Sequence, residues 1–324
     1  MRAGGYFYTE DSKMTRRVRH RRGRELHGIV LLDKPTGLTS NNALQRIKRL
    51  FKASKAGHTG SLDPLATGML PICFGAGTKI SSFLLDAHKR YRVTGRLGIG
   101  TDSGDADGKI ISEGPLIELK ADTVGGVLAA FQGEIEQIPP MYSALKHKGR
   151  RLYELAREGV EVVREVRRVR IFSIDLLRCE WPELVFNVTC SKGTYVRTLV
   201  EDIAKALGTL GHVIQLRRLA IEPFEEHQMV DMQALEASAE EGLASLDQCL
   251  LPIDAALTKW PRVVVEADLC ESLTHGQSVP AQPDWPHAWV RVYSPDNIFL
   301  GIGEVRMHGQ LVPRRIFPVM ASIV

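Results

Sequence analysis

Short apolar runs alternate along the chain with amphipathic stretches, and this pattern predicts a mixture of strands and helices. The apolar run over residues 28–33 precedes the turn sequence Lys34-Pro35-Thr36-Gly37 and predicts a buried strand. Over residues 91–97 apolar and polar positions alternate, with Tyr91 on the apolar side, which is typical of a half-buried strand. Further strands are predicted at 69–74, 169–177, 184–190 and 212–221.

Helical spacing of apolar residues begins after Ser40, a residue type that caps helix N-termini, so we expect Ser40 to cap this helix. A second amphipathic stretch, 198–207, is followed by Gly208, and glycine commonly follows the end of a helix. By contrast, residues 137–151 contain two adjacent prolines and several basic residues, and they predict a loop. Weaker patterns predict helices at 79–87, 122–131, 152–157 and 230–246.

The order of these elements is irregular and lacks the strict strand–helix alternation of a doubly wound fold, so the pattern predicts an α+β architecture. After a linker-like stretch at 251–261, proline, glycine and valine become frequent, which predicts a small all-β domain. We therefore expect a basic, disordered arm over 1–24, a large α+β domain over 25–250 and a small β domain over 258–324.

The distribution of charge is more informative than its sum, which is only +4. Six arginines lie between Arg16 and Arg24, and two further basic clusters occupy 146–151 and 164–170. Such clusters suit contacts with phosphate groups. Solvated surface charge is the ordinary alternative for any one cluster, but three clusters in one chain favour a nucleic-acid partner.

Several classes of protein are disfavoured by the sequence. No apolar run approaches the ~18 residues of a membrane span, and the N-terminus lacks the apolar segment of a secretory signal. The acidic run 102–108 lacks the spacing of a calcium loop, and no phosphate-binding loop or dinucleotide fingerprint is present. We expect a cytoplasmic protein without metal or cofactor, with reduced thiols at its scattered cysteines, which are Cys73, Cys179, Cys190, Cys249 and Cys270.

The segment 57–68, GHTGSLDPLATG, presents a candidate nucleophile, Asp63, from a loop rich in glycine. Pro64 disfavours the helical conformation for Asp63, so we expect a rigid, extended presentation of the carboxylate. Attack by a side chain requires such fixed geometry. Aspartate before proline is also a common turn residue, and the neighbouring His58 is more often a local hydrogen-bonding residue than a catalyst.

A second candidate constellation lies in the segment 191–197, SKGTYVR. If the preceding strand continued to Arg197, Tyr195 and Arg197 would share one face, because side chains in a strand repeat every two residues. An aromatic ring beside a cation suits a flat, polar ligand such as a base. The alternative is a tyrosine that packs across strands and an arginine on the surface, and Tyr91 is by default a core or edge aromatic.

Several segments in order resemble the bacterial tRNA pseudouridine-55 synthases, which isomerise a uridine in the T loop of transfer RNA. The segment GHTGSLDPLATGMLP (57–71) resembles their catalytic motif. The segments GIGEV (301–305) and LVPRRIF (311–317) resemble their small C-terminal RNA-binding domain of the PUA type. The similarity spans about residues 23–320, and the other segments that carry it are LLDKPTGLTS (31–40), KRYRVTGRLGIGTDSGDADG (89–108), PPMYSALKHKGRRLYELAREG (139–159), SKGTYVRTL (191–199) and HVIQLRRLAI (212–221).

The resemblance implies a catalytic domain over 25–250 with a mixed or antiparallel sheet, followed by a PUA-like domain. It places Asp63 on the catalytic aspartate, Tyr91 on the active-site tyrosine and Arg197 on the arginine that pairs with the aspartate. Three other positions match residues that contact RNA or line the base pocket, namely His58, Tyr195 and Leu216. The residues that would support the catalytic loop are Lys34, Pro35 and Gly60.

The implied reaction is an isomerisation on a flipped-out base, and it requires no cofactor. Asp63 must be ionised, and an arginine within ~4–6 Å lowers a carboxyl pKa by roughly 1–3 units, so we expect Arg197 to keep Asp63 charged. Tyr91 would stack on the uracil and is the nearest candidate to accept the C5 proton.

The expected partner is the T stem-loop of transfer RNA, bound by a monomer without an obligate protein partner. Two alternatives stay open. One is the guide-RNA-dependent branch of the same superfamily, and the other is an RNA-binding or tRNA-folding protein whose catalysis is secondary.

Overall fold

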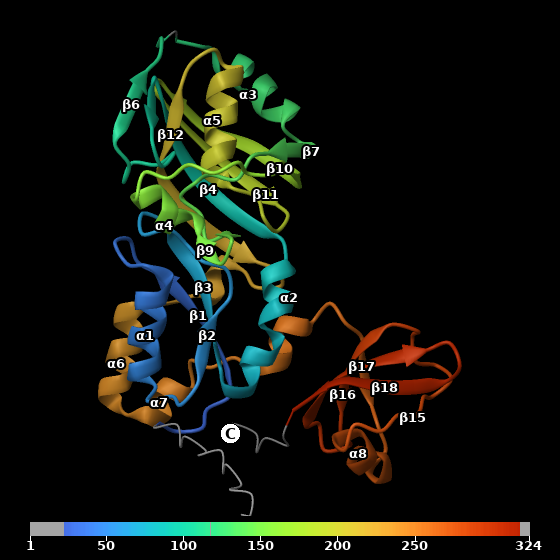
Figure 1. The fold of residues 1–324 in the computed structure, drawn as a ribbon. Helices are drawn as coiled ribbons and strands as arrows, with labels where there is room; N and C mark the ends of the chain where they lie inside the picture. Colours follow the sequence, from blue (N-terminus) through green and yellow to red (C-terminus); the bar gives the residue numbers. More distant parts are fainter. Residues whose placement is uncertain (1–22, 117, 318–324) are drawn as a thin grey trace, which may run out of the picture.

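The computed structural model describes residues 23–116 and 118–317, which form an elongated main body with a smaller lobe beside one end (Figure 1). The predicted basic arm lies outside the described residues except for Gly23 and Arg24. Arg24 is bonded to the body: its Nε donates to the carbonyl of Phe51 (2.9 Å) and its Nη1 to the carboxylate of Asp247 (2.8 Å). Arg24 therefore belongs with the folded domain that follows it.

One large sheet forms the centre of the main body, and it confirms the predicted α+β class with a mixed sheet. Its strands are mostly antiparallel, but β1 pairs in parallel with β13, and β3 pairs in parallel with β12. This arrangement sets β3, β12 and β4 side by side at the centre of the sheet. In spatial order the strands are β13 (Val230–Asp231), β1 (Gly28–Lys34), β3 (Thr67–Phe74), β12 (Gly211–Ile221), β4 (Lys89–Leu97), β11 (Glu183–Cys190), β10 (Arg167–Glu180) and β7 (Gly133–Gln137), and β2 (Ala56–His58) pairs with β3.

Helices cover this sheet in two groups (Figure 1). The helices α1 (Ser40–Leu50), α6 (Met232–Glu241) and α7 (Leu243–Asp247) gather at one end of the body, and α3 (Ala121–Ala130) and α5 (Val196–Ala206) lie at the other end. Each buries an apolar side in the core, as α1 does with Ala43, Leu44 and Ile47. The smaller elements are η1 (Gly75–Ile80), α2 (Ser81–Asp86), α4 (Leu152–Arg157), η2 (Glu226–Gln228), η3 (Ile253–Leu257) and the hairpins β5 (Ile99–Thr101)–β6 (Ile110–Glu113) and β8 (Lys146–His147)–β9 (Arg150–Arg151).

Several predicted element boundaries were wrong for local reasons. Thr39, not Ser40, caps α1: its hydroxyl accepts a hydrogen bond from the Asn42 N–H (3.1 Å). The single helix predicted at 230–246 is divided into β13, α6 and α7, because Gly242 takes a positive φ of 129° that ends α6. The loop predicted at 137–151 contains the hairpin β8–β9, and the helix predicted at 79–87 starts as the 3₁₀ turn η1.

The smaller lobe is a five-stranded sheet in the order β14-β16-β17-β18-β15, as expected for the predicted C-terminal β domain. The prediction omitted one helix, α8 (Ala267–Thr274), which packs on this sheet. Ile302 and Phe317 of the lobe share an apolar cluster with Ile29 and Leu31 of β1, so the lobe is joined to the body through buried contacts. The strand bounds are β14 (Arg262–Val264), β15 (Val279–Pro280), β16 (Trp289–Tyr293), β17 (Phe299–Arg306) and β18 (Gln310–Ile316).

The exact boundary predicted between 250 and 258 stays a prediction, because η3 packs in the apolar cluster that both parts share. All five cysteines lie in the described residues, and each is a free thiol. Among residues 23–116 and 118–317, no helix is both long and apolar enough to cross a membrane.

Candidate active site

Asp63 lies in the loop between β2 and β3, and the backbone on both sides of it is tied to the start of α1. The Ser40 hydroxyl accepts a hydrogen bond from the Leu62 N–H (2.7 Å) and donates to the Leu62 carbonyl (2.9 Å). On the other side of Asp63, the Gly37 N–H donates to the Pro64 carbonyl (2.8 Å). Asp63 is therefore presented from a fixed loop, as its sequence context predicted.

Lys34 joins the same loop to the end of β1. Its fully buried ammonium group donates to the carbonyls of Pro35 (2.8 Å), Leu38 (2.7 Å) and Pro64 (3.4 Å). Burial lowers the pKa of Lys34 to about 8, and the negative charge of Asp63 acts in the opposite direction. These contacts agree with the supporting role that we predicted for Lys34 and Pro35, a role that stays a prediction.

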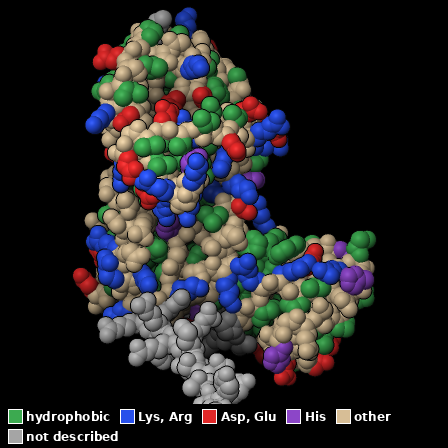
Figure 2. All heavy atoms as spheres, viewed as in Figure 1, with side chains coloured by type: hydrophobic (Ala, Val, Ile, Leu, Met, Phe, Trp, Pro, Cys, Tyr) green, Lys and Arg blue, Asp and Glu red, His purple; other side chains and the backbone are tan. Residues whose placement is uncertain are grey.

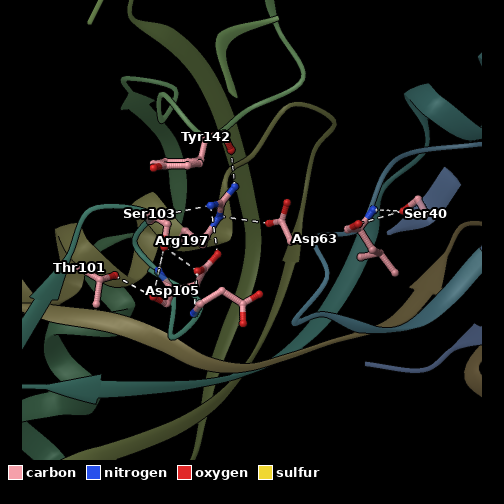
Figure 3. A network of polar contacts seen from close by, with 9 residues as sticks. Ser40, Asp63, Thr101, Ser103, Asp105, Tyr142 and Arg197 are labelled. Atoms are coloured by element: carbon pink, nitrogen blue, oxygen red, sulfur yellow. Dashed lines mark hydrogen bonds and ion pairs between the residues drawn. The ribbon is translucent and has the colours of Figure 1, made fainter. Parts of the chain in front are cut away.

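Arg197 provides the positive charge beside Asp63 (Figure 3). It lies in the first turn of α5 with only 6% of its surface exposed, and its Nε is 3.1 Å from Oδ2 of Asp63. The other guanidinium nitrogens donate to the carbonyls of Ser103 (2.8 Å) and Tyr142 (2.6 Å). The orientation of the guanidinium is therefore set by contacts from two other segments of the chain.

Asp105 is the second carboxylate partner of Arg197, at 3.1 Å from Nη1 (Figure 3). It is buried, and it accepts hydrogen bonds from the Ser103 hydroxyl (2.6 Å) and the Asp107 N–H (3.2 Å). Sequence reasoning missed this role, because the acidic run 102–108 was weighed only as a calcium loop. Among the described residues no cluster of metal-ligating side chains is found.

Two opposing effects act on the pKa of Asp63. Burial raises the pKa of Asp63 above its ordinary value of 3.8, and the attraction of Arg197 opposes that rise without reversing it. The negative charge of Asp105 adds to the rise. The physical reason is that burial disfavours the charged carboxylate more than the guanidinium of Arg197 favours it. The Asp63 side chain remains 41% exposed and open to a ligand.

Tyr91 and Leu216 lie on neighbouring central strands. Tyr91, on β4, is half-buried, and its Cα partner on β12 is Arg218. Leu216 is buried two residues before Arg218 and is paired with Val93. Burial raises the pKa of the Tyr91 phenol, and the charge of Arg218 acts against this rise. Arg218 also donates to the carbonyl of Gly60 (3.0 Å), so Tyr91 is paired with a residue that contacts the Asp63 loop.

His58 and Tyr195 lie at the ends of their elements. His58 is the last residue of β2; its pKa is lowered by burial and then by the charges of Arg218 and Arg151. The N–H of Tyr195 donates to Oε1 of Gln137 (3.0 Å), at the start of α5. Burial raises the pKa of the Tyr195 phenol, and the charges of Arg197 and Asp63 also act on it.

The structure therefore brings Asp63 to Arg197, at the helix start that also carries Tyr195, and it pairs Tyr91 with Arg218, which contacts the Asp63 loop. The route by which we predicted that Tyr195 and Arg197 approach each other was wrong. The strand β11 ends at Cys190, and a turn leads to Tyr195 as the residue that caps α5. A helix start, rather than one face of a strand, directs Arg197 to Asp63.

Two glycines of the segment 57–68 have conformations that glycine alone adopts readily. Gly60 has a φ of +76° and Gly68 a φ of +96°. A Cβ atom on Gly68 would lie 2.2 Å from the backbone oxygen of Arg218, so β3 and β12 approach closely only because Gly68 has no side chain. The prediction that Gly60 supports the loop agrees with its conformation.

Basic side chains gather across the middle of the face shown in Figure 2, where Figure 1 places α4 and β9. The predicted basic cluster 146–151 contributes to this region, and its residues Lys146, Lys148, Arg150 and Arg151 are exposed. Arg151 lies near enough to His58 to lower its pKa. A basic surface thus adjoins the Asp63 site, as phosphate recognition requires.

Comparison with family models matches nearly the whole described chain. Residues 48–196 match the model described as TruB family pseudouridylate synthase (N terminal domain). Residues 197–258 match the tRNA pseudouridylate synthase B C-terminal domain. Residues 261–317 match the model described as Pseudouridine synthase II TruB, C-terminal.

Similar proteins span almost the same length. A protein of Nitrosococcus oceani named tRNA pseudouridine synthase B is 49% identical over 301 residues, covering 93% of this chain and 98% of that protein. A protein of Coxiella burnetii with the same name is 47% identical over 294 residues, covering 90% of this chain and 95% of that protein. Among solved structures, a Cbf5-Nop10-Gar1 complex contains a chain with a TM-score of 0.69 and 25% identity, covering 90% of this chain and 84% of that chain.

Proposed function

Because the chain belongs to the TruB family of pseudouridylate synthases and is an RNA uridine isomerase, we propose that it acts on the T-loop uridine at position 55 of transfer RNA with Asp63 as nucleophile. The observation that carries this proposal is the Asp63–Arg197 contact of 3.1 Å at the edge of a partly exposed site. A carboxylate that is fixed by its loop, oriented by a guanidinium and open on one side is suited to attack a bound base or sugar.

The proposed reaction breaks the C1′–N1 bond, rotates the uracil and forms a C1′–C5 bond; the proton on C5 is lost and N1 takes up a proton. Substrate and product are isomers, so the step needs neither an oxidant nor a reductant. The uridine must first leave its stack, which costs a few kcal/mol. We assign to His58 the position vacated by the flipped base, because an uncharged imidazole ring can stack on neighbouring bases and its lowered pKa favours the neutral form.

The remaining site residues have proposed roles that follow from their positions. Tyr91 stacks on the flipped uracil, and its hydroxyl accepts the C5 proton. Tyr195 and Leu216 line the pocket around the base, and Arg197 orients the Asp63 carboxylate. Lys34, Pro35 and Gly60 hold the loop that carries Asp63, as supported by the hydrogen bonds from Lys34 and the positive φ of Gly60.

Tritium release from transfer RNA labelled at uracil C5 tests this proposal directly, because it measures loss of the C5 proton. We expect release with the wild-type chain and none with Asp63→Asn or Asp63→Ala, while both variants still bind the RNA. Transfer RNA with cytidine in place of the T-loop uridine is the matched control and should release no tritium from that position. Substantial release by Asp63→Asn would remove Asp63 as the nucleophile.

We further propose that the chain acts in the cytoplasm as a monomer without an obligate protein partner. The solved chain that it resembles was crystallised with Nop10 and Gar1, so a requirement for partners is the alternative to test. Purified protein should modify bare transfer RNA and elute at the mass of one chain in size-exclusion chromatography. Activity only after addition of other proteins or a guide RNA would contradict this part of the proposal.

A further inference from the structure

Arg218 is a charged side chain inside the protein that none of the roles above uses. It is 1% exposed, and its side chain is one of the largest that are fully buried. Within residues 23–116 and 118–317, no carboxylate lies at ion-pair distance from it, whereas Arg197 has two. Burial of a charge without a counter-ion is costly unless hydrogen bonds compensate. The hydrogen bonds of the Arg218 guanidinium must therefore compensate for the cost of its burial.

The guanidinium binds the backbone on both sides of Asp63. Its Nε donates to the carbonyl of Met69 (2.7 Å), and its Nη2 donates to the carbonyl of Gly60 (3.0 Å). Gly60 lies three residues before Asp63, and Met69 lies six residues after it. The rigid, planar guanidinium therefore sets the separation of these two carbonyls. The flexible ammonium group of a lysine cannot do this equally well.

The side chain of Arg218 also lies beside that of Tyr91. Arg218 and Tyr91 are Cα partners on the adjacent strands β12 and β4, so their side chains lie on the same face of the sheet. On its other side, Arg218 is the Cα partner of Gly68 on β3. Arg218 thus occupies the one central strand that lies between the Asp63 loop and Tyr91.

We propose that Arg218 is a positioning residue that holds the Asp63 loop and the Tyr91 ring at a fixed separation. This inference rests on the proposed roles of Asp63 and Tyr91 on either side of a flipped uracil. Asp63 lies in a loop and Tyr91 on β4, and Arg218 lies on the strand between them. Arg218 acts through them and needs no contact with the RNA.

Arg217 is a matched control on the same strand. Its guanidinium is directed to the carboxylates of Asp33 (2.9 and 2.7 Å) and Glu226 (3.0 Å), and it touches neither the loop carbonyls nor Tyr91 in the described contacts. Arg217→Lys and Arg218→Lys are therefore the same chemical change at adjacent positions. Only the second removes the hydrogen bonds to the carbonyls of Gly60 and Met69.

The experiment measures single-turnover tritium release, RNA binding and thermal unfolding for wild type, Asp63→Asn, Arg217→Lys and Arg218→Lys. Arg218→Gln is the second replacement at this position, in case Arg218→Lys does not unfold cooperatively on heating. We expect Arg218→Lys to lose on the order of 10²-fold in rate, because small displacements of reacting groups have effects of this size. RNA affinity should stay near that of wild type, and Arg217→Lys should retain most of the activity.

The comparison of rate with RNA affinity separates positioning from general destabilisation. Arg218→Lys should lose rate at temperatures well below its unfolding transition, while it still binds the RNA as wild type does. A loss of RNA affinity that parallels the loss of rate, or a wild-type rate for Arg218→Lys, would overturn the proposal. Asp63→Asn reports independently on the proposed nucleophile: if it were active, the function assigned to Asp63 would fail whatever Arg218 does.

Discussion

The Nε atom of Arg197 lies 3.1 Å from Oδ2 of Asp63, and this contact organises the site. The same guanidinium also binds the buried Asp105 at 3.1 Å, so two carboxylates share one positive charge. Orientation and charge are therefore separate contributions of Arg197. Its position is fixed by Asp105 and two backbone carbonyls, and its charge only partly offsets the burial of Asp63.

Replacement of Arg197 by lysine tests the value of its planar shape. A lysine keeps the positive charge, but its single nitrogen cannot contact Asp63, Asp105 and the carbonyls of Ser103 and Tyr142 at once. We expect Arg197→Lys to lose on the order of 10²-fold in single-turnover rate, with a small change in RNA affinity. Tritium release and filter binding measure the two quantities. A rate equal to that of wild type would exclude Arg197 from the mechanism.

The pH dependence of the rate should report the raised pKa of Asp63. The nucleophile must be ionised, so the rate falls as the pH decreases through this pKa. Because the pKa is raised above 3.8, the fall should begin at a higher pH than for an ordinary aspartate. Single-turnover rates across the acidic range, with RNA in excess of its dissociation constant, measure this limb.

Asp105→Asn should move that limb. The charge of Asp105 raises the pKa of Asp63, so the neutral asparagine lowers this pKa and shifts the acidic limb to lower pH. The rate at neutral pH should fall, because Arg197 loses one of its carboxylate partners. Asp102→Asn is the control, since Asp102 accepts a hydrogen bond from the Lys109 N–H (2.8 Å) and does not contact Arg197. An acidic limb that moves upward in Asp105→Asn would contradict the electrostatic argument.

Ser40→Ala should damage both stability and activity. The change leaves the buried N–H and carbonyl of Leu62 without their side-chain partner, which costs about 1–3 kcal/mol in the free energy of unfolding. Leu62 precedes Asp63, so the rate should also fall. Thr39→Ala removes the helix cap at the adjacent residue and should cost ~1 kcal/mol in stability with the rate preserved. Equal rates in the two variants would show that Ser40 does not position the loop.

Gly68→Ala tests the close approach of β3 to β12. The added methyl group would meet the Arg218 carbonyl oxygen at 2.2 Å, at a φ of +96°, so we expect a loss of more than ~3 kcal/mol in the free energy of unfolding. Gly208→Ala has a similar φ of +78° and nothing within 4 Å of the added atom, so it should cost only ~1 kcal/mol. Chemical denaturation of both variants measures the difference. Equal losses would show that the positive φ alone, and not the contact with Arg218, destabilises Gly68→Ala.

Much of the fold could be predicted from local patterns. The apolar runs that became β1 and β3 and the alternation that became β4 depend on residues close in sequence, and these strands were predicted within a few residues. The predicted element boundaries were wrong where a single contact determined the end of the element. The hydroxyl of Ser40 is hydrogen-bonded to Leu62, which lies 22 residues away in the sequence. Thr39 rather than Ser40 therefore caps the helix.

By itself the sequence determined the family, the presence of a glycine-rich loop that presents Asp63, and the identity of Arg197 as its partner. These depend on residue type and order, which the chain displays directly. Only the tertiary structure decided that Asp105 shares Arg197 and that Arg218 lies beneath the Asp63 loop beside Tyr91. Both contacts join segments about 90 to 160 residues apart, and the pKa of Asp63 depends on the balance of burial and all nearby charges. No local pattern encodes that balance, because it exists only after the strands have paired.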